Sequence, residues 1–299
     1  MKVLLTGANG QLGQALRLQK PANVTLIATS RQGGGGCLAL DLADAGACRA
    51  AVEQHRPDWV INAGAYTGVD RAEQEPELAL AVNAGAPRAF AAAVRDYGGR
   101  LLQISTDFVF NGMQGSPYRI DQSRSPLGSY GRSKAAGEEA VETMLGDKGL
   151  GVILRTSWVM GPVGHNFALT MLRLHRERSG SGQHLAVVAD QVGSPTSTTT
   201  LATACWQVLS LTEPPAILHW SDAGVASWYD VAVAVGELAE ANGLLSSSAL
   251  VQPITTADYP TPAQRPAYSV LDCSFSRRSL DPPATHWRTT LGLFLAAIN

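Results

Sequence analysis

The chain has 299 residues, and 23 lysines and arginines face 25 aspartates and glutamates, which gives a formal net charge of −2. This length allows one or two domains with a sizeable core, and the near-neutral charge excludes the strongly basic surface typical of nucleic-acid-binding proteins. No apolar run approaches the ~20 residues that a membrane-spanning helix needs, and the N-terminus becomes glycine-rich too early for a secretory signal. We therefore expect a cytoplasmic protein with neither a membrane nor a nucleic-acid partner.

The four cysteines, at positions 37, 48, 205 and 273, show no paired spacing, and the six histidines form no cluster in the sequence. A disulfide framework and a zinc site both require regular ligand spacings. The sequence predicts neither.

The first element is an apolar strand over residues 2–6, followed by the turn GANGQLG and a helical run from Gln14. A strand, a glycine turn and a helix form the context of a dinucleotide-binding fingerprint, because glycines let the pyrophosphate approach and the helix N-terminus offers free N–H groups. The spacing is G-x-x-G-x-x-G, and the alternative is a plain turn. We predict that this turn binds a dinucleotide through Gly7, Asn9, Gly10, Gln11, Leu12 and Gly13.

The second predicted strand, residues 24–29, ends at Ser30-Arg31 rather than at an acidic residue. A hydroxyl and a guanidinium suit a ribose 2′-phosphate, so the sequence favours NADPH, with NADH as a possible second cofactor. The alternative is that Arg31 is only a surface charge. After a glycine loop and a third short strand over residues 37–40, Asp41 and Leu42 are candidates for contacts to the adenine.

A helix over residues 44–55 leads to a buried strand over residues 59–62, and a long alanine-rich helix is expected over residues 76–97. The next strand, residues 100–105, ends at Thr106 and Asp107. Ligands bind at the carboxyl ends of parallel strands, so these elements should face one crevice. The further cofactor-binding candidates here are Ala63, Gly64, Ala65, Tyr66 and Asn83.

Tyr130 and Lys134 follow the helix-start signal Pro126-Leu127-Gly128 and are four residues apart. Side chains at this spacing lie on one face of a helix. An ammonium near a phenol favours the phenolate, so we expect Tyr130 to exchange a proton near neutral pH as a general acid. The alternative is a solvated helix face, and the catalytic interpretation depends on a surrounding dinucleotide fold.

A strand over residues 151–156 completes an alternation of strands and helices that predicts a doubly wound parallel α/β sheet of the Rossmann type. We predict a dinucleotide-binding domain over residues 1–160, to which part of 196–222 returns. Residues 161–195 and 223–299 should form a smaller, interleaved substrate domain. Its expected elements are helices over 166–178, 194–211, 227–242 and 287–298, strands over 186–189 and 217–220, and a Pro-rich loop over 250–268.

Eight segments resemble the dTDP-4-dehydrorhamnose reductase family of the extended short-chain dehydrogenases/reductases, and together they span nearly the whole chain. They are GANGQLG, NAGAYTGVDRAE, STDFVF, SPLGSYGRSK, RTSWV, NFALTMLRL, DQVGSPT and YPTPAQRPAYSVLD.

The resemblance implies NADPH-dependent reduction of the C4 keto group of dTDP-4-dehydro-L-rhamnose, in the supply of dTDP-L-rhamnose for surface polysaccharide. It implies that Thr106, Tyr130 and Lys134 are catalytic, with Tyr130 and Lys134 also touching the cofactor. It further implies that Thr106, Asp107, Trp158, Asn166 and Arg265 bind the substrate. An arginine fork matches a diphosphate, although Arg265 in a surface salt bridge is the alternative. No role follows for the loop Thr67–Asp70.

Two other functions remain open. One is another sugar-nucleotide enzyme, such as a different reductase, an epimerase or a 4,6-dehydratase. Dehydratases typically carry an Asp-Glu pair after the threonine, whereas Phe108 follows Asp107 here. The other is a non-catalytic binding subunit of the same fold, similar to the regulatory β subunit of methionine adenosyltransferase. The sequence leaves the nucleotide base, the sugar stereochemistry and the oligomeric state undetermined.

Some members of this family form dimers around Mg²⁺ held by glutamates, and the aligned residues here are Ala15, Thr199 and Arg288. Mg²⁺ needs hard oxygen ligands, which these side chains do not offer. We therefore expect no metal, and either a monomer or a dimer that Mg²⁺ does not bridge. Glu237 and Glu240 are expected to lie elsewhere.

Overall fold

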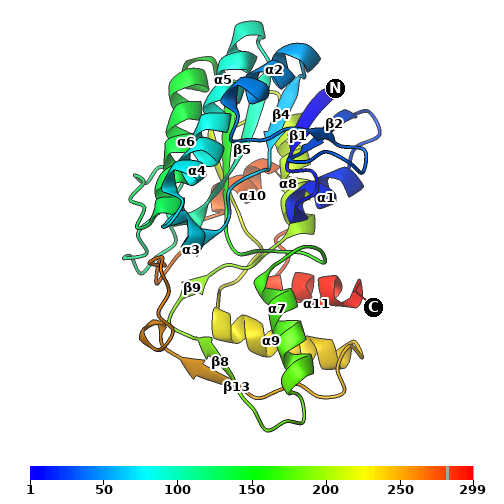
Figure 1. Cartoon of the computed structure of the whole chain (residues 1–299), viewed down its shortest axis with the longest axis vertical. Coiled ribbons are helices and arrows are strands. Elements are labelled where there is room, and N and C mark those ends of the chain that lie inside the picture. Colours follow the sequence, from blue (N-terminus) through cyan, green and yellow to red (C-terminus); the bar gives the residue numbers. More distant parts are fainter. Residues whose placement is uncertain (281–282, 299) are drawn as a thin grey trace.

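The computed structural model describes residues 1–280 and 283–298 (Figure 1). Within these residues, the main feature is a seven-stranded sheet of order β11-β6-β5-β4-β1-β2-β3, in which every neighbouring pair is parallel. Its strands are β1 (Lys2–Thr6), β2 (Thr25–Ser30), β3 (Leu38–Ala39), β4 (Trp59–Asn62), β5 (Arg100–Thr106), β6 (Gly151–Thr156) and β11 (Ile217–Trp220). The predicted doubly wound parallel fold is confirmed.

Helices cover both faces of this sheet, which explains the almost continuous apolar character of its central strands. One face carries α1 (Gln11–Leu18), α8 (Thr198–Ser210) and α10 (Ser274–Leu280), whose core residues include Leu16, Leu201 and Leu280. The other face carries α2 (Ala45–His55), α5 (Ala86–Tyr97) and α6 (Ser129–Leu145), seen together in Figure 1.

The strand order reverses between β1 and β4, since β2 and β3 extend the sheet on one side of β1 and β4 to β6 on the other. In open α/β sheets, such a switch point opens a crevice at the carboxyl ends of the strands. The turn after β1, the turn after β4 and the residues after β5 therefore lie at the same edge.

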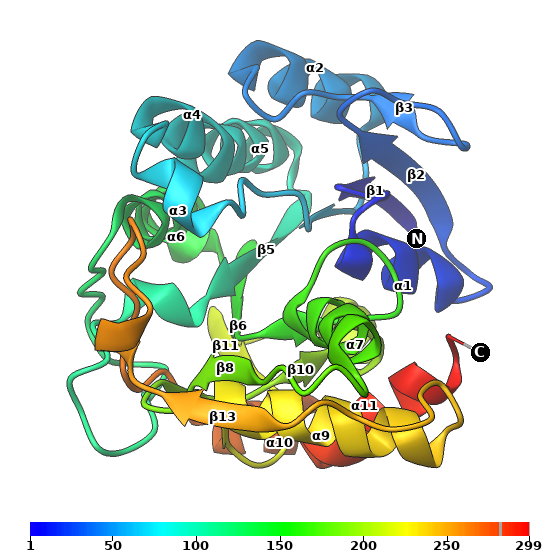
Figure 2. The same ribbon diagram turned by 60° about the horizontal axis from the view of Figure 1, so that its bottom comes forward.

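A second, smaller region has its own core (Figure 2). It contains the helices α7 (Phe167–Arg178), α9 (Trp228–Ala241) and α11 (Trp287–Ala296) and the parallel pair β8 (Leu185–Val188) with β13 (Val251–Ile254). Two short ladders join it to the chain around the crevice, β7 (Val159–Met160) with β10 (Thr196–Ser197) and β9 (Val192–Gly193) with β12 (Ala226–Ser227).

The largest differences from the structure concern two predicted elements and two helices that were not predicted. The Pro-rich stretch 250–268 is not all loop, because it contains β13, where Pro253 is tolerated in a strand with one described neighbour. The helix expected over 76–97 is divided into α4 (Pro76–Leu80), a π-helical turn (Ala81–Gly85) and α5. The sequence analysis missed α10 and the short helix α3 (Val69–Ala72).

The predicted domain boundaries stay a prediction. The return of β11 to the sheet beside β6 supports the assignment of residues 196–222. However, α10, which was assigned to the substrate domain, packs against β11 and α8. In the described part of the chain, no helix has the length and apolarity needed to cross a membrane.

Candidate active site

Thr106, Tyr130 and Lys134 meet at the carboxyl end of β5. The Thr106 hydroxyl donates to Asp107 Oδ1 at 3.0 Å and interacts with the Tyr130 phenol. Lys134 is 4% exposed, and its Nζ donates to the carbonyl oxygen of Ile104 at 2.6 Å. The Tyr130 ring also contacts the edge of Phe108, with ring centroids 5.5 Å apart. The tertiary structure thus brings the three predicted catalytic side chains together.

The pKa of Tyr130 moves in the direction opposite to the prediction. Burial raises the pKa of Tyr130 to about 12, while the Thr106 hydroxyl acts in the lowering direction. In this structure, the Lys134 ammonium donates to the Ile104 carbonyl. Burial also lowers the pKa of Lys134 to about 8. Tyr130 therefore holds its proton at neutral pH, which is the form that a general acid needs.

Asp107 lies directly beside this group and is 2% exposed. Burial raises the pKa of Asp107 to about 6, against the opposing hydroxyls of Ser269 and Thr106. Among the described residues, its Oδ2 atom has no hydrogen-bond partner. A buried carboxyl oxygen without a donor is able to accept a hydrogen bond from a ligand hydroxyl.

The glycine turn after β1 has the close backbone packing expected of a phosphate cradle. Gly7 has φ +63°, and a Cβ on it would lie 2.6 Å from the Cα of Gly64. A Cβ on Gly13 would lie 2.1 Å from the carbonyl oxygen of Gly7. α1 starts at Gln11, three residues earlier than predicted, and its N-cap, Gly10, provides no side-chain cap. Its first N–H groups are therefore not taken by a capping side chain.

The residues predicted to read the adenosine end lie at the carboxyl ends of β2 and β3. The side chain of Arg31 is 66% exposed, and its Nε is 4.0 Å from Asp41 Oδ1. Ser30 is buried and donates to the carbonyl oxygen of Gly33 at 3.2 Å. The Leu42 side chain contacts Gly64, so Leu42 joins this end of the crevice to the turn after β4. Arg31 therefore has the freedom to approach a phosphate.

The turn Ala63–Tyr66 is fixed by Asn83 from the π-helical turn. Asn83 accepts from the backbone N–H of Tyr66 at 2.9 Å and donates to the Tyr66 carbonyl at 3.0 Å and to Ser133 Oγ at 2.9 Å. The Tyr66 hydroxyl donates to Glu75 Oε2 at 2.6 Å. In this structure, Asn83 joins the turn to α6 through its own side chain, so its predicted contact to the cofactor stays a prediction.

Trp158 and Asn166, predicted to bind the substrate, lie where the second region meets the crevice. Trp158 has φ +45°, and its ring stacks on the ring of Trp228 with centroids 3.5 Å apart. The Trp158 ring also packs against the backbone of Gly193, where a Cβ would lie 2.5 Å from it. Asn166 caps α7 by accepting from Leu169 N, and its amide donates to Gln11 Oε1 at 2.7 Å. The Asn166 amide thus contacts Gln11 of the glycine turn directly.

Arg265 is held within the chain. Its guanidinium bonds both carboxylate oxygens of Asp70, at 2.8 and 3.1 Å, and also contacts Thr261 and the Ala263 carbonyl. The alternative interpretation, a salt bridge, therefore describes this structure, and diphosphate binding stays a prediction. Because Asp70 binds Arg265, the loop Thr67–Asp70, for which the sequence indicated no role, has a structural role.

A buried ion pair that was not predicted from the sequence joins Glu138 of α6 to Arg155 of β6. Glu138 follows Lys134 by four residues, the same spacing that links Tyr130 to Lys134. The four-residue spacing therefore indicated, from the sequence alone, that Glu138 lies on the same helix face as Tyr130 and Lys134.

In the described residues, no group of three or more His, Cys, Asp and Glu side chains could hold a metal ion. Arg288 forms an ion pair with Glu237, which the sequence analysis placed elsewhere. α9 and α11 pack together and bring the two side chains into contact. The expectation of no bound metal, and of a monomer or a dimer that Mg²⁺ does not bridge, stays a prediction.

The parallel sheet, its glycine turn and the Thr106, Tyr130 and Lys134 group define an extended short-chain dehydrogenase/reductase. The sequence matches the family model described as RmlD substrate binding domain over residues 1–299. The chain therefore belongs to the dTDP-4-dehydrorhamnose reductase (RmlD) family.

Three related proteins illustrate the range of the family. A dTDP-4-dehydrorhamnose reductase of Streptomyces griseus is 40% identical over 295 residues, covering 96% of this chain and 91% of that protein. A probable dTDP-4,6-dihydroxy-2-methyloxan-3-one 4-ketoreductase of Streptomyces antibioticus is 39% identical, covering 97% and 93% of the two chains. The crystal structure of dTDP-4-dehydrorhamnose reductase from Bacillus anthracis in complex with NADP has a TM-score of 0.88 at 32% identity, covering 99% of both chains.

Proposed function

We propose that this protein is an NADPH-dependent oxidoreductase that reduces the C4 keto group of dTDP-4-dehydro-L-rhamnose to give dTDP-L-rhamnose, a precursor of surface polysaccharide. The observation that carries the proposal is the meeting of Thr106, Tyr130 and Lys134 at the crevice beside the glycine turn. The names of the relatives support the substrate class, a dTDP-linked 4-keto sugar.

The residues around the glycine turn fit a dinucleotide. The positive φ of Gly7 and the contact of Gly13 with the Gly7 carbonyl leave no room for side chains where the backbone would approach a pyrophosphate. Arg31 offers an exposed guanidinium at the end of β2 for a 2′-phosphate. When bound, NADPH would supply the hydride for the reduction.

The protein's own residues supply the proton and hold the carbonyl. In the proposed reaction, Tyr130 gives its phenolic proton to the C4 oxygen as hydride reaches C4, so that the ketone becomes an alcohol. Thr106 donates a hydrogen bond to the same oxygen, and the Lys134 ammonium stabilises the phenolate that remains. Asp107 accepts from a neighbouring sugar hydroxyl through its unpartnered Oδ2 atom.

A second candidate is reduction of a different dTDP-4-keto sugar, because the Streptomyces antibioticus relative is named for such a substrate. An epimerase would consume no NADPH overall, and a non-catalytic subunit would turn over no sugar.

We propose a cytoplasmic location, consistent with four buried free cysteines.

The decisive experiment follows NADPH oxidation with purified dTDP-4-dehydro-L-rhamnose and identifies the product by chromatography. Formation of dTDP-L-rhamnose in equal amount to the NADPH consumed supports the proposal. A parallel reaction with dTDP-4-dehydro-6-deoxy-D-glucose measures sugar selectivity. Absence of NADPH oxidation with either sugar would exclude reduction of these two substrates.

A further inference from the structure

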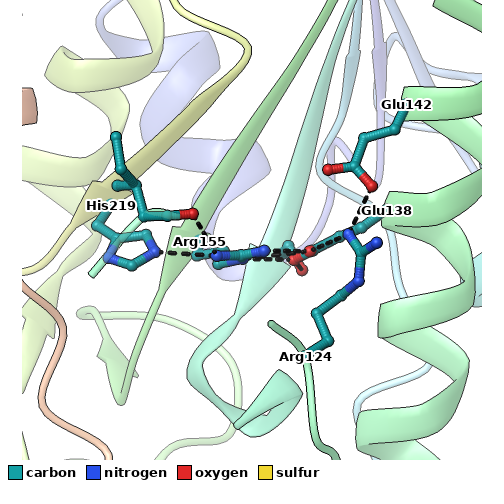
Figure 3. Close-up of polar contacts among 7 residues, drawn as sticks. Arg124, Glu138, Glu142, Arg155 and His219 are labelled. Carbon is teal, nitrogen blue, oxygen red and sulfur yellow. Dashed lines mark hydrogen bonds and ion pairs between the residues drawn. The ribbon is translucent and has the colours of Figure 1, made fainter. Parts of the chain in front are cut away.

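Glu138 continues the helix face that carries the catalytic side chains. Tyr130, Lys134 and Glu138 lie at four-residue intervals on α6, and side chains at this spacing are neighbours along a helix. The carboxylate is 0% exposed and lies at the centre of a network of charged side chains (Figure 3). An ionised group this deep in a protein needs several partners.

Arg155 of β6 is the main partner of Glu138. The guanidinium donates from Nε to Oε1 at 2.9 Å and from Nη2 to Oε2 at 2.7 Å, a bidentate arrangement. Arg124 adds a third contact, from its Nη1 to Oε2 at 3.2 Å. The pKa of Glu138 is lowered: burial acts to raise it, but the hydrogen bonds and charge of Arg155 outweigh that effect. Glu138 is therefore a carboxylate at neutral pH.

The third partner, Ser105, joins this ion pair to the catalytic threonine. The Ser105 hydroxyl donates to Glu138 Oε1 at 2.5 Å, and Ser105 immediately precedes Thr106 at the end of β5. One carboxylate on the helix of Tyr130 and Lys134 is thus bonded to the strand end of Thr106.

The sheet register fixes the partners of Glu138. Ser105 is aligned with Arg155 in the pairing of β5 with β6, and Arg155 is aligned with His219 in the pairing of β6 with β11. His219 Nε2 lies 3.3 Å from Arg155 Nη1, which also donates to the Ile120 carbonyl (Figure 3). Burial lowers the pKa of His219 to about 3, so its ring is neutral and accepts from the guanidinium. The Arg155 guanidinium is therefore held by Glu138 on one side and by His219 on the other.

Stability alone is a weak explanation for this arrangement. A buried ion pair often contributes no more to folding than apolar side chains of similar volume, because both charges lose their hydration. Its fixed geometry, however, suits the requirement that reacting groups be held within a fraction of an ångström.

We infer that Glu138, held by Arg155, is a positioning residue for the reduction, because it locks the helix face of Tyr130 and Lys134 to the strand end of Thr106. This inference rests on the proposed function. Glu138 is not expected to touch the sugar, since it is fully buried and its oxygens are occupied by Ser105, Arg124 and Arg155.

Glu138 also acts on the charge of Lys134. Tyr130 and Glu138 lie one turn from Lys134 on α6, and Asp107 and Arg155 lie on two elements that pack against α6, the turn after β5 and the strand β6. Burial lowers the pKa of Lys134 to about 8, and the Glu138 carboxylate is the group that opposes this effect. Without the negative charge, the lysine should lose its proton at a lower pH.

The test compares Glu138→Gln with Glu142→Gln. Glu142 binds Arg124 at the edge of the same network and is 36% exposed, so it is a matched control that does not contact Ser105 or Arg155. The rate of the proposed reduction should fall as pH rises through the pKa of Lys134. In Glu138→Gln, we expect this fall to move about one pH unit lower. We also expect kcat at neutral pH to decrease about 10-fold with the sugar KM unchanged. Glu142→Gln should match the wild type.

Two further measurements keep the inference testable. Ser105→Ala removes only the hydroxyl and should lower kcat about 10-fold without moving the pH profile. NADPH binding, measured by fluorescence against pH, should weaken at a lower pH in Glu138→Gln, and this readout needs no sugar turnover. An inactive wild type would exclude the proposed function but leave the binding comparison valid.

The inference is overturned if folded Glu138→Gln keeps the wild-type kcat, or if it keeps the wild-type pH dependence in both measurements. If Glu138→Gln does not fold, Ser105→Ala decides, and wild-type kcat in that variant overturns the inference.

Discussion

Arg265 and Asp70 form a bidentate ion pair that joins the Pro-rich segment of the second region to α3 beside the crevice, with Nη2 2.8 Å from Oδ2. The guanidinium of Arg265 lowers the pKa of Asp70, so the carboxylate stays ionised. Asp70 also accepts from the backbone N–H of Ala263, which fixes the loop that carries the arginine. The arginine is thereby oriented by a residue 195 positions away in sequence.

We expect Arg265→Ala to raise the KM for the dTDP-sugar about 10- to 100-fold while kcat changes little, because a charge-assisted contact is worth about 1.5–3 kcal/mol. Initial rates against substrate concentration measure this effect. Arg278→Ala, which removes an exposed arginine from α10, is the control. An unchanged KM in Arg265→Ala would show that the pair with Asp70 is structural only.

Tyr130→Phe should lower kcat by about 10²–10⁴-fold, the usual contribution of general acid catalysis, because only the phenolic proton is lost. NADPH binding should remain within a few-fold of the wild type, since the ring and its contact with Phe108 are retained. Stopped-flow measurement of the reduction rate tests the expected loss of kcat, and titration with NADPH tests the expected retention of cofactor binding. Near wild-type kcat would exclude Tyr130 as the proton donor.

Arg31→Ala should weaken NADPH binding more than NADH binding, because the guanidinium is exposed beside the end of β2 and only NADPH carries a 2′-phosphate. Dissociation constants for both cofactors, measured at two salt concentrations, separate a direct contact from general charge. Equal losses for NADPH and NADH would show that Arg31 does not distinguish them.

Asp107→Asn should lower activity and raise stability at neutral pH. The folded protein raises the pKa of Asp107 to about 6, so the buried carboxylate is destabilising above that pH, and the cost disappears as pH falls towards 4. The variant should gain on the order of 1–3 kcal/mol at pH 7.5, from ~1.4 kcal/mol per pKa unit. Urea unfolding at pH 7.5 and 4.5 should show this gain shrink at the lower pH. A gain independent of pH would contradict the assignment of the effect to this carboxyl.

Chelation should leave activity and oligomeric state unchanged, because Ala15, Thr199 and Arg288 offer no carboxylate and Glu237 is paired with Arg288. Sedimentation with EDTA and with added Mg²⁺ measures the state, and the reductase assay measures the activity. A dimer that dissociates with EDTA and reforms with Mg²⁺ would contradict this prediction.

The sequence by itself determined the local features. The apolar strands and the glycine turn follow from residue patterns over a few positions, and the four-residue spacing places Tyr130 and Lys134 on one helix face. Parallel pairing then puts the ends of β1, β4 and β5 at one edge, so Thr106 could be placed near the glycine turn, whereas its grouping with Tyr130 and Lys134 was implied only by the family resemblance. Tyr130 and Lys134 could therefore be paired from short-range chemistry alone.

Only the tertiary structure decided which charges pair and how burial shifts their pKa values. The alignment of Ser105, Arg155 and His219 depends on register across three strands, and the partner of Arg265 lies on a distant helix. The upward shift of the Tyr130 pKa likewise depends on burial by surrounding elements, which opposes the local effect expected from Lys134. Long-range packing sets these distances and dielectric environments, because they depend on residues far apart along the chain.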